Sequence, residues 1–181
     1  GPYAARAWWL LRWIGHTAVA VLDGGAAAWQ AAGGPLSSAP AEPAAAPPYP
    51  RAKAAMPSID VDTLLARLGQ QPLLDARAGD RFRGETEPLD AVAGHIPGAL
   101  NRFFKHNLRS DGRFKSAAEL RDEFAALGLD GDQAPVHQCG SGVTACHNLL
   151  AMEHAGLHGS VLYPGSWSEW SADPQRPMAV G

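Results

Sequence analysis

The sequence is poor in cysteine, in clustered charge and in long apolar runs, and each shortage excludes a class of protein. Its 181 residues include two cysteines, Cys139 and Cys146, too few for a disulfide framework and typical of a reducing cytoplasm. The net charge is −3 and the cations are scattered, which argues against nucleic-acid and anionic-membrane partners. No apolar stretch reaches membrane-spanning length, because Arg12 interrupts the Trp-rich segment at 8–14.

Metal-binding and targeting signals are also missing from the sequence. The seven histidines are dispersed, and no Cys/His cluster has zinc-ligand spacing. No segment has the order of charged, apolar and small residues that marks a signal peptide. We therefore expect a cytoplasmic protein that has no membrane partner and no metal site.

A proline-rich stretch at 37–57 divides the chain. Proline lacks a backbone donor and restrains the residue before it, so this stretch cannot hold a helix or a central strand. It is typical of a semi-rigid linker. We expect a short piece at 1–36 and a full domain at 58–178.

Helix and strand signals alternate through 58–178. Short strands are expected at 72–75, 99–101, 135–138 and 161–163, and the first and third of them are expected to be buried. Helices are expected from Asp60 or Asp62 to Gly69, from Ser116 to Leu127, and from Ala145 to about His154. This alternation predicts an α/β fold with a central parallel sheet and helices on both faces.

The short piece resembles the end of the long one. A shift of 141 positions pairs Gly15 with Gly156 and Trp29 with Trp170, so that 4–29 matches 145–170. Both copies have the order helix, glycine, short strand, glycine, small-residue turn and tryptophan. The same shift pairs Gly1 with Gly142. We therefore expect residues 1–36 to be the tail of a first domain whose front is missing.

The strongest chemical signal is the segment at 139–145, with the sequence CGSGVTA. Cys139 follows a buried strand and precedes a helix, so free N–H groups and the helix dipole favour its thiolate. Gly140 and Gly142 allow positive φ angles and close approach of amides to an anion. We interpret Cys139 as a nucleophile and not as a buried structural residue.

Two other uses of a cysteine in this setting fit the sequence poorly. A cysteine-dependent phosphatase needs an arginine six residues after the cysteine, where this chain has Ala145. A thioredoxin-like dithiol needs the spacing Cys-x-x-Cys, whereas Cys146 lies seven positions after Cys139 and inside the expected helix. Cys146 is interpreted as a packed small residue.

Several motifs in order resemble the two-domain rhodanese family, and the 139–145 loop is most similar to that of its 3-mercaptopyruvate sulfurtransferases. The other motifs are LDAR at 74–77, RFRG at 81–84, EP at 87–88, GHIPGA at 94–99 and YPGSWSEW at 163–170. LDGG at 22–25 with Trp29 resembles the end of the family's non-catalytic first domain. The resemblance implies that 58–178 is a catalytic rhodanese domain and that 1–36 is a remnant of the non-catalytic one.

The family implies a two-step sulfur transfer that needs no cofactor. Cys139 takes the outer sulfur of a donor to form a persulfide, and an acceptor then removes this sulfur. The acceptors to consider are a protein thiol such as thioredoxin, a small thiol and cyanide. The alternative interpretation is a weakly active or inactive rhodanese-like module with a binding or regulatory role.

The expected site residues follow from the loop and from the resemblance. Loop amides would stabilise the anionic sulfur, and the substrate-binding residues of the loop are Gly140, Gly142, Val143, Thr144 and Ala145. Ser141 is the candidate for handling the thiol proton of the donor. Arg81 matches the family's substrate-binding arginine and would hold a carboxylate, unless it forms a surface ion pair with Asp80 or Glu85.

The loop chemistry also bears on which donor is used. Its side chains carry no cation, which suits a thiol donor with one carboxylate, such as 3-mercaptopyruvate, better than the thiosulfate dianion. Some family members carry a second arginine near the position of Asp90, so we expect weaker mercaptopyruvate binding here. Thiosulfate is the second choice of donor.

The remaining polar candidates are expected to be structural. His95 and His137 are assigned to packing, and Asp75 is expected to hold loop backbone. The six tryptophans are assigned to packing and to contacts between domains. Because the short piece cannot bury a core alone, we expect it to dock, to pair with another chain by self-association, or to belong to a larger protein. We expect low activity from this chain by itself, because the partner surface of the first domain is missing.

Overall fold

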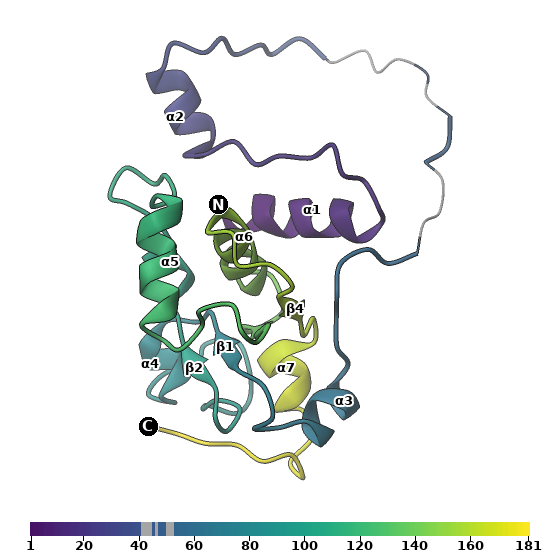
Figure 1. Cartoon of the computed structure of the whole chain (residues 1–181), viewed down its shortest axis with the longest axis vertical. Coiled ribbons are helices and arrows are strands. Elements are labelled where there is room, and N and C mark those ends of the chain that lie inside the picture. The colour runs from purple at the N-terminus through teal and green to yellow at the C-terminus, as the bar shows by residue number, and fades with distance from the viewer. Residues whose placement is uncertain (41–44, 46, 50–52) are drawn as a thin grey trace.

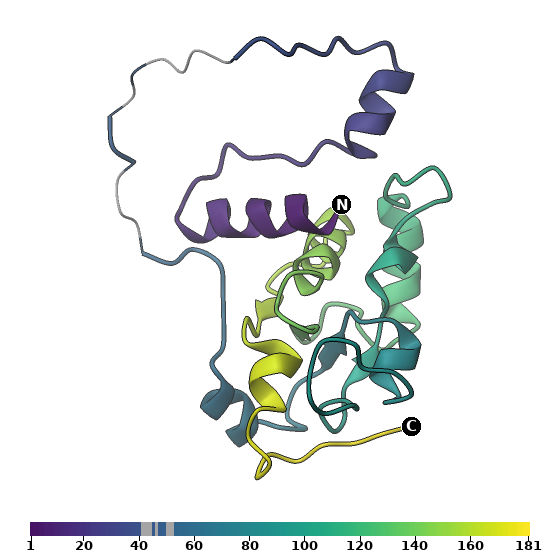
Figure 2. The ribbon, with the colours of Figure 1, turned by 180° about the vertical axis from the view of Figure 1, so that it is seen from behind.

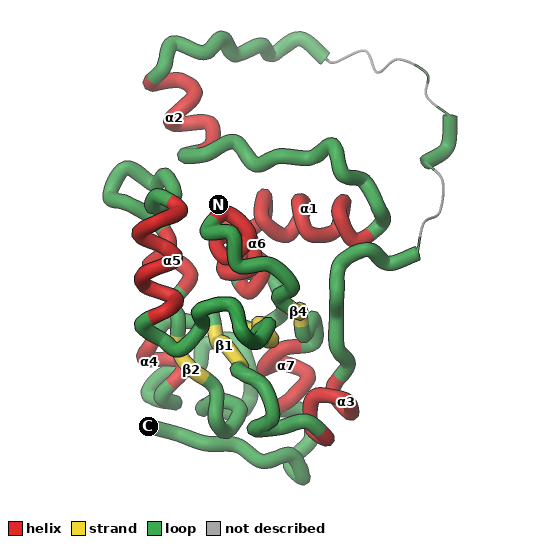
Figure 3. The backbone as a smooth tube through the Cα atoms, in the orientation of Figure 1, coloured by secondary structure: helices red, strands yellow, loops and turns green. Residues whose placement is uncertain are grey.

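The computed structural model describes residues 1–40, 45, 47–49 and 53–181, and its centre is a four-stranded parallel sheet. The strands are β1 (Leu73–Asp75), β2 (Leu100–Asn101), β3 (Val136–Gln138) and β4 (Val161–Leu162), in the spatial order β2-β1-β3-β4. Leu74 pairs with Leu100 on one side and with His137 on the other, so β1 and β3 are central (Figures 1 and 3). The predicted α/β class and the four strand positions are confirmed.

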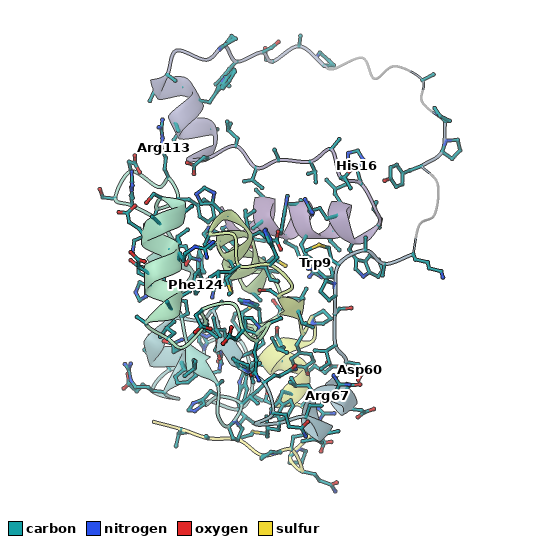
Figure 4. All side chains as sticks on the ribbon, viewed as in Figure 1. Trp9, His16, Asp60, Arg67, Arg113 and Phe124 are labelled. Carbon is teal, nitrogen blue, oxygen red and sulfur yellow. The ribbon has the colours of Figure 1, made fainter. Side chains whose placement is uncertain are left out.

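Helices cover both faces of the sheet, as predicted. Consecutive residues of a strand point to opposite faces, and on β1 Leu73 packs with one set of helices and Leu74 with another. Leu73 shares a buried cluster with residues of α3 (Val61–Ala66) and α7 (Ser166–Trp170), including Trp167 and Trp170. Leu74 packs with α5 (Ala117–Ala125) and α6 (Ala145–His154), including Phe124, which is labelled in Figure 4.

The helices α3 and α5 begin with the capping interactions that the sequence predicts. Asp60 caps α3 by accepting the Thr63 amide at 2.8 Å. Ser116 and Glu119 form a capping box at the start of α5. Two further helices, α4 (Gly79–Phe82) and the 3-10 helix η1 (Phe104–Asn107), are too short for the sequence pattern to have predicted.

The N-terminal piece docks on the sheet-containing part through α1 (Pro2–Trp13), which packs against α6 (Figure 2). Ala5, Trp8 and Trp9 are buried in one cluster with Cys139 and Cys146. Figure 4 shows Trp9 on the side of α1 that faces the sheet. The expected docking of this piece is therefore observed within the chain itself.

The short strand expected around Val21 does not form, which corrects that prediction. Residues 18–22 have no strand partner within the described residues, and Val19 and Val21 pack on the cluster of α1 and α6. The outer edge of β4 is already taken, because Ile59 donates to the Leu162 carbonyl and Leu162 to the Pro57 carbonyl. Leu162, which the shift of 141 positions pairs with Val21, forms its ladder with β3, and the described residues of the N-terminal piece contain no counterpart of β3 for Val21 to join.

The secondary structure is compatible with the proposed repeat. Under the shift of 141 positions, α6 falls on α1, and α7 falls on α2 (Gly25–Ala31). Gly15 and Gly156 follow the paired helices with φ of 88° and 75°. The duplication and the domain limits at 1–36, 37–57 and 58–178 stay predictions, and part of the linker (41–44, 46 and 50–52) lies outside the described residues.

No described helix has both the length and the hydropathy needed to cross a bilayer.

His137 belongs to the core, as expected from its place on β3. Its side chain is fully buried, with Nε2 at 3.2 Å from the Ser160 hydroxyl and no partner for Nδ1 in the described part of the chain. Burial lowers the pKa of His137 to about 3. The imidazole is therefore neutral in the folded protein at neutral pH.

This burial predicts acid sensitivity of the fold. Between the unfolded pKa of about 6.5 and the folded pKa of about 3, the unfolded chain binds a proton at His137 that the folded chain does not. The free energy of unfolding should therefore fall with falling pH, by up to about 1.4 kcal/mol per pH unit from this group. Denaturant titrations of the parent and of His137→Leu at pH 7, 6 and 5 measure the slope. The variant should show the shallower slope, and equal slopes would contradict the prediction.

Candidate active site

Cys139 lies directly after β3, at the carboxyl end of a central strand. The loop of residues 139–144 leads from it into α6, which begins at Ala145 as predicted. The Cys139 side chain is 2% exposed and its amide donates to the Ser166 hydroxyl at 3.1 Å. The nucleophile candidate is therefore held in place by α7, which comes from a later part of the chain.

Four carbonyl groups of the loop accept hydrogen bonds from backbone donors outside it. Trp167 and Ser168 of α7 donate their amides to the carbonyls of Cys139 and Gly140, at 3.0 and 2.9 Å. The first turn of α6 does the same at the other end of the loop. There Cys146 and His147 donate to the carbonyls of Val143 and Thr144, at 3.2 and 3.1 Å.

This arrangement leaves the amide groups of the loop available. In a trans peptide the N–H points away from the C=O, and the structure has no cis peptide in its described residues. The six consecutive amides from Gly140 to Ala145 donate no hydrogen bond within the described part of the chain. Such a series of free N–H groups at the start of a helix is an anion-binding cradle. The loop residues proposed to bind substrate thus contribute a free backbone N–H each.

Gly142 is required by the shape of the loop. Its φ is +75°, a region that side chains rarely adopt. A Cβ at this position would also lie 2.5 Å from the Pro164 carbonyl oxygen. The loop can therefore pack against the start of α7 only with glycine at 142.

Arg81 reaches the loop from α4. A Cβ built on Gly140 would lie 3.5 Å from Arg81 Nη2, so the guanidinium lies against the backbone of this residue. Arg81 pairs with Glu87 at 2.6 Å and lies 3.6 Å from Asp90, and not with Asp80 or Glu85. Its Nη1 donates no hydrogen bond within the described residues. Arg81 is thus next to the Cys139 loop with one donor nitrogen unused.

Glu87 links Arg81 to a second, buried arginine, and the sequence did not predict this role. Its side chain is 4% exposed and lies 3.3 Å from Arg77 Nη1. Burial raises the pKa of Glu87, but hydrogen bonds from Arg81 and from the Leu89 and Asp90 amides outweigh this effect and the net pKa is lowered. A charged Glu87 therefore holds both arginines.

Arg77 and Asp75 form the buried base of this network. Asp75 accepts Arg77 Nη2 at 2.7 Å and the Arg77 amide at 2.9 Å, which supports the expected role of Asp75 in holding loop backbone. Arg77 also donates to the Gly94 carbonyl at 2.7 Å and lies over the Trp167 ring, 5.0 Å from its centroid. One guanidinium therefore connects β1, the 87–94 loop and α7.

Ser141 differs from its neighbours in being exposed. Its hydroxyl makes no hydrogen bond within the described residues, so it is available to a ligand. Val143 and Thr144 are half-buried, and Ala145 is buried at the first position of α6.

The other cysteine is a packed residue, as interpreted from the sequence. Cys146 is fully buried, and its thiol donates to the Gly142 carbonyl at 3.4 Å. Burial raises the pKa of Cys146 to about 11, which disfavours a thiolate. This environment is the opposite of what a resolving thiol needs.

Two histidines near the site, His95 and His147, pack against aromatic rings. His95 stacks on Phe82 at 3.9 Å and binds the Phe82 carbonyl at 2.8 Å. His147, which the sequence reasoning did not single out, stacks on Phe114, and burial lowers its pKa to about 4. No group of three potential metal ligands occurs among the described residues.

Comparisons with known proteins agree with this geometry. The family described as "Rhodanese-like domain" matches residues 60–173. A probable 3-mercaptopyruvate sulfurtransferase of Pseudomonas aeruginosa is 53% identical, over 100% of this chain and 65% of its own length. The human 3-mercaptopyruvate sulfurtransferase is 41% identical over 100% of this chain and 63% of its own length. A putative thiosulfate sulfurtransferase of Mycobacterium tuberculosis is also 41% identical, over 98% of this chain and 63% of its own length.

Among solved structures, wild-type EanB has the same fold, with a TM-score of 0.87 at 23% identity over 98% of this chain and 44% of that one. The chain spans a little under two thirds of the length of the curated relatives named above. The match to the family spans α3 through α7 and includes the Cys139 loop and Arg81. On these grounds the chain belongs to the rhodanese family.

Proposed function

We propose that this chain carries the catalytic site of a sulfurtransferase. The sulfur would pass from 3-mercaptopyruvate, or from thiosulfate as second choice, to a thiol or cyanide through a persulfide on Cys139. The observation that carries the proposal is the row of six free amides from Gly140 to Ala145 that follows the cysteine. Preorganised donors of this kind stabilise an anion without reorganisation during the reaction.

The proposed chemistry balances in two steps. The Cys139 thiolate attacks the sulfur of mercaptopyruvate, an S–S bond forms and the C–S bond breaks. The electron pair leaves with the three-carbon fragment, which takes up a proton and becomes pyruvate. With thiosulfate, the S–S bond of the donor breaks and sulfite leaves. An acceptor thiolate, such as that of thioredoxin, or cyanide then attacks the outer sulfur and regenerates the Cys139 thiolate.

Arg81 and Ser141 have separate roles in this proposal. The unused Nη1 of Arg81, beside Gly140, would bind the donor carboxylate, since arginine matches carboxylate geometry well. The exposed Ser141 hydroxyl would accept the thiol proton of the donor or pass it on. Asp90, at 3.6 Å from Arg81, lowers the local positive charge and should weaken carboxylate binding.

The relatives support the choice of donor only in part. Proteins named for 3-mercaptopyruvate and for thiosulfate are both similar to this chain. The neutral side chains of the 139–145 loop favour mercaptopyruvate, because thiosulfate carries two charges. The domain limits, a cytoplasmic location, self-association and low activity of the chain alone belong to the same proposal.

The direct test is the mass of the peptide that contains Cys139. Incubation with mercaptopyruvate should add about 32 Da, one sulfur atom, to this peptide. Cys139→Ser should show no addition, and Cys146→Ala should keep it, because the Cys146 thiol is buried with a raised pKa. Intact and peptide mass spectrometry measure both results.

Thiosulfate and Ser141→Ala provide the controls. Thiosulfate should give the same product more slowly, and Ser141→Ala should slow the reaction with mercaptopyruvate only, because thiosulfate brings no thiol proton. A folded sample that forms no persulfide with either donor would overturn the proposal in favour of a non-catalytic rhodanese-like module.

Arg81 can be tested against Arg83, its exposed neighbour. Arg83 is paired with Glu85 at 2.7 Å and is 48% exposed, so it serves as a matched control. Loss of a charge-assisted hydrogen bond costs about 1.5–3 kcal/mol, so Arg81→Gln should raise KM for mercaptopyruvate about 10- to 100-fold. Arg83→Gln should leave KM within about twofold of the parent. Steady-state kinetics decide, and equal effects of the two substitutions would contradict the assignment.

A further inference from the structure

We propose that Arg6 of α1 is a positioning residue for the Cys139 loop, and this inference rests on the proposed function. The N-terminal piece would then contribute to the site through one side chain, 133 positions before the nucleophile in the sequence. Arg6 would act on the loop backbone and on its electrostatic potential, without touching the substrate.

Arg6 is placed by the packing of α1 on α6. Its neighbours Ala5 and Trp9 are buried in the cluster that contains Cys139. The Arg6 guanidinium lies over the Trp9 ring, 5.2 Å from its centroid, and its Nη1 donates to the Gly142 carbonyl at 3.4 Å. No acidic side chain pairs with it among the described residues. A half-buried cation without a carboxylate partner is thus directed at the loop.

The contact of Arg6 with Gly142 supplies a hydrogen-bond donor to a loop carbonyl that no described backbone amide reaches. The carbonyls of Cys139 and Gly140 are held by α7, and those of Val143 and Thr144 by the first turn of α6. Among the described residues, the Gly142 carbonyl between these two groups accepts no backbone hydrogen bond, and its donors are the Arg6 guanidinium and the Cys146 thiol. Because C=O and N–H are opposed in a trans peptide, fixing this carbonyl also fixes the direction of the Val143 N–H.

Arg6 also supplies the charge that the loop sequence lacks. The 139–145 segment contains no cation, yet a thiolate and then a persulfide anion must form within it. Arg6 Nη1 lies 3.7 Å from Cys146 Sγ, so its charge is beside the loop. Among the described residues, Arg81 also lies against the loop at Gly140, where Glu87 and Asp90 face its charge. The Cys146 thiol and the His147 imidazole beside the loop are neutral at pH 7, because burial raises the pKa of the thiol to about 11 and lowers that of the imidazole to about 4.

The test compares Arg6→Gln with Arg12→Gln. Arg12 is on the same helix and lies over the Trp8 ring, 5.5 Å from its centroid, and within the described part of the chain its side chain forms no hydrogen bond or ion pair with the loop. Alkylation of Cys139 by iodoacetamide is followed at peptide level as a function of pH, without any sulfur donor. Arg6→Gln should raise the pH of half-maximal alkylation by about one unit, and Arg6→Lys should restore most of the shift.

A second readout is the rate of Cys139 persulfide formation. Arg6→Gln should lower this rate roughly tenfold, less than loss of a direct oxyanion donor costs, with a smaller effect on KM. Arg6→Met keeps the apolar stem over Trp9 and replaces Arg6→Gln if that variant fails to fold. The inference is overturned if the folded Arg6 variant and Arg12→Gln give the same alkylation profile. If the parent forms no persulfide, the proposed function is wrong instead. The two failures can be told apart, because alkylation of Cys139 needs no sulfur transfer.

Discussion

The ion pair between Arg77 and Asp75 is the interaction on which the rest of the site depends. Both side chains are almost fully buried at the end of β1, the strand that pairs with β2 and β3. Breaking such a pair leaves an uncompensated buried charge and typically costs about 3–5 kcal/mol. The pair is tolerated because the other Arg77 donors are also satisfied, by Glu87 and by the Gly94 carbonyl.

Two branches lead from this pair to the two sides of the Cys139 loop. Through Glu87 the charge network reaches Arg81, which lies against Gly140. Through stacking on Trp167 it reaches α7, whose amides hold the carbonyls at the start of the loop. The helix α1 adds a third support through Arg6, at the Gly142 carbonyl. The free amides of the loop are the common result of these contacts.

Features set by neighbouring residues could be predicted from the sequence. The capping box of Ser116 and Glu119, the start of α6 and the four strands depend on local pattern, and the structure has all of them. The short strand near Val21 was predicted wrongly, because a strand needs a partner and the described residues of the N-terminal piece contain no counterpart of β3. No local pattern contains this information.

Contacts between side chains that come from different elements of the fold could not be predicted from the sequence. Arg81 was expected at the site and lies there, but its pairing with Glu87 depends on how the 84–90 turn folds back over α4. The contact of Arg6 with Gly142 joins residues 136 positions apart and follows only from the packing of α1 on α6. The motif that contains Glu87 marked it as a family feature without indicating that it joins two arginines.

Glu87 links Arg77 to Arg81, so it should act on the Cys139 loop through Arg81, and a double-mutant cycle measures this coupling. The rate of persulfide formation at Cys139 would be measured for the parent, Glu87→Gln, Arg81→Gln and the double variant. If the network works as one unit, the double variant should be within about twofold of the slower single variant, because coupled residues are not additive. If the two effects multiply, Glu87 and Arg81 act independently, and the charge network does not work as one unit.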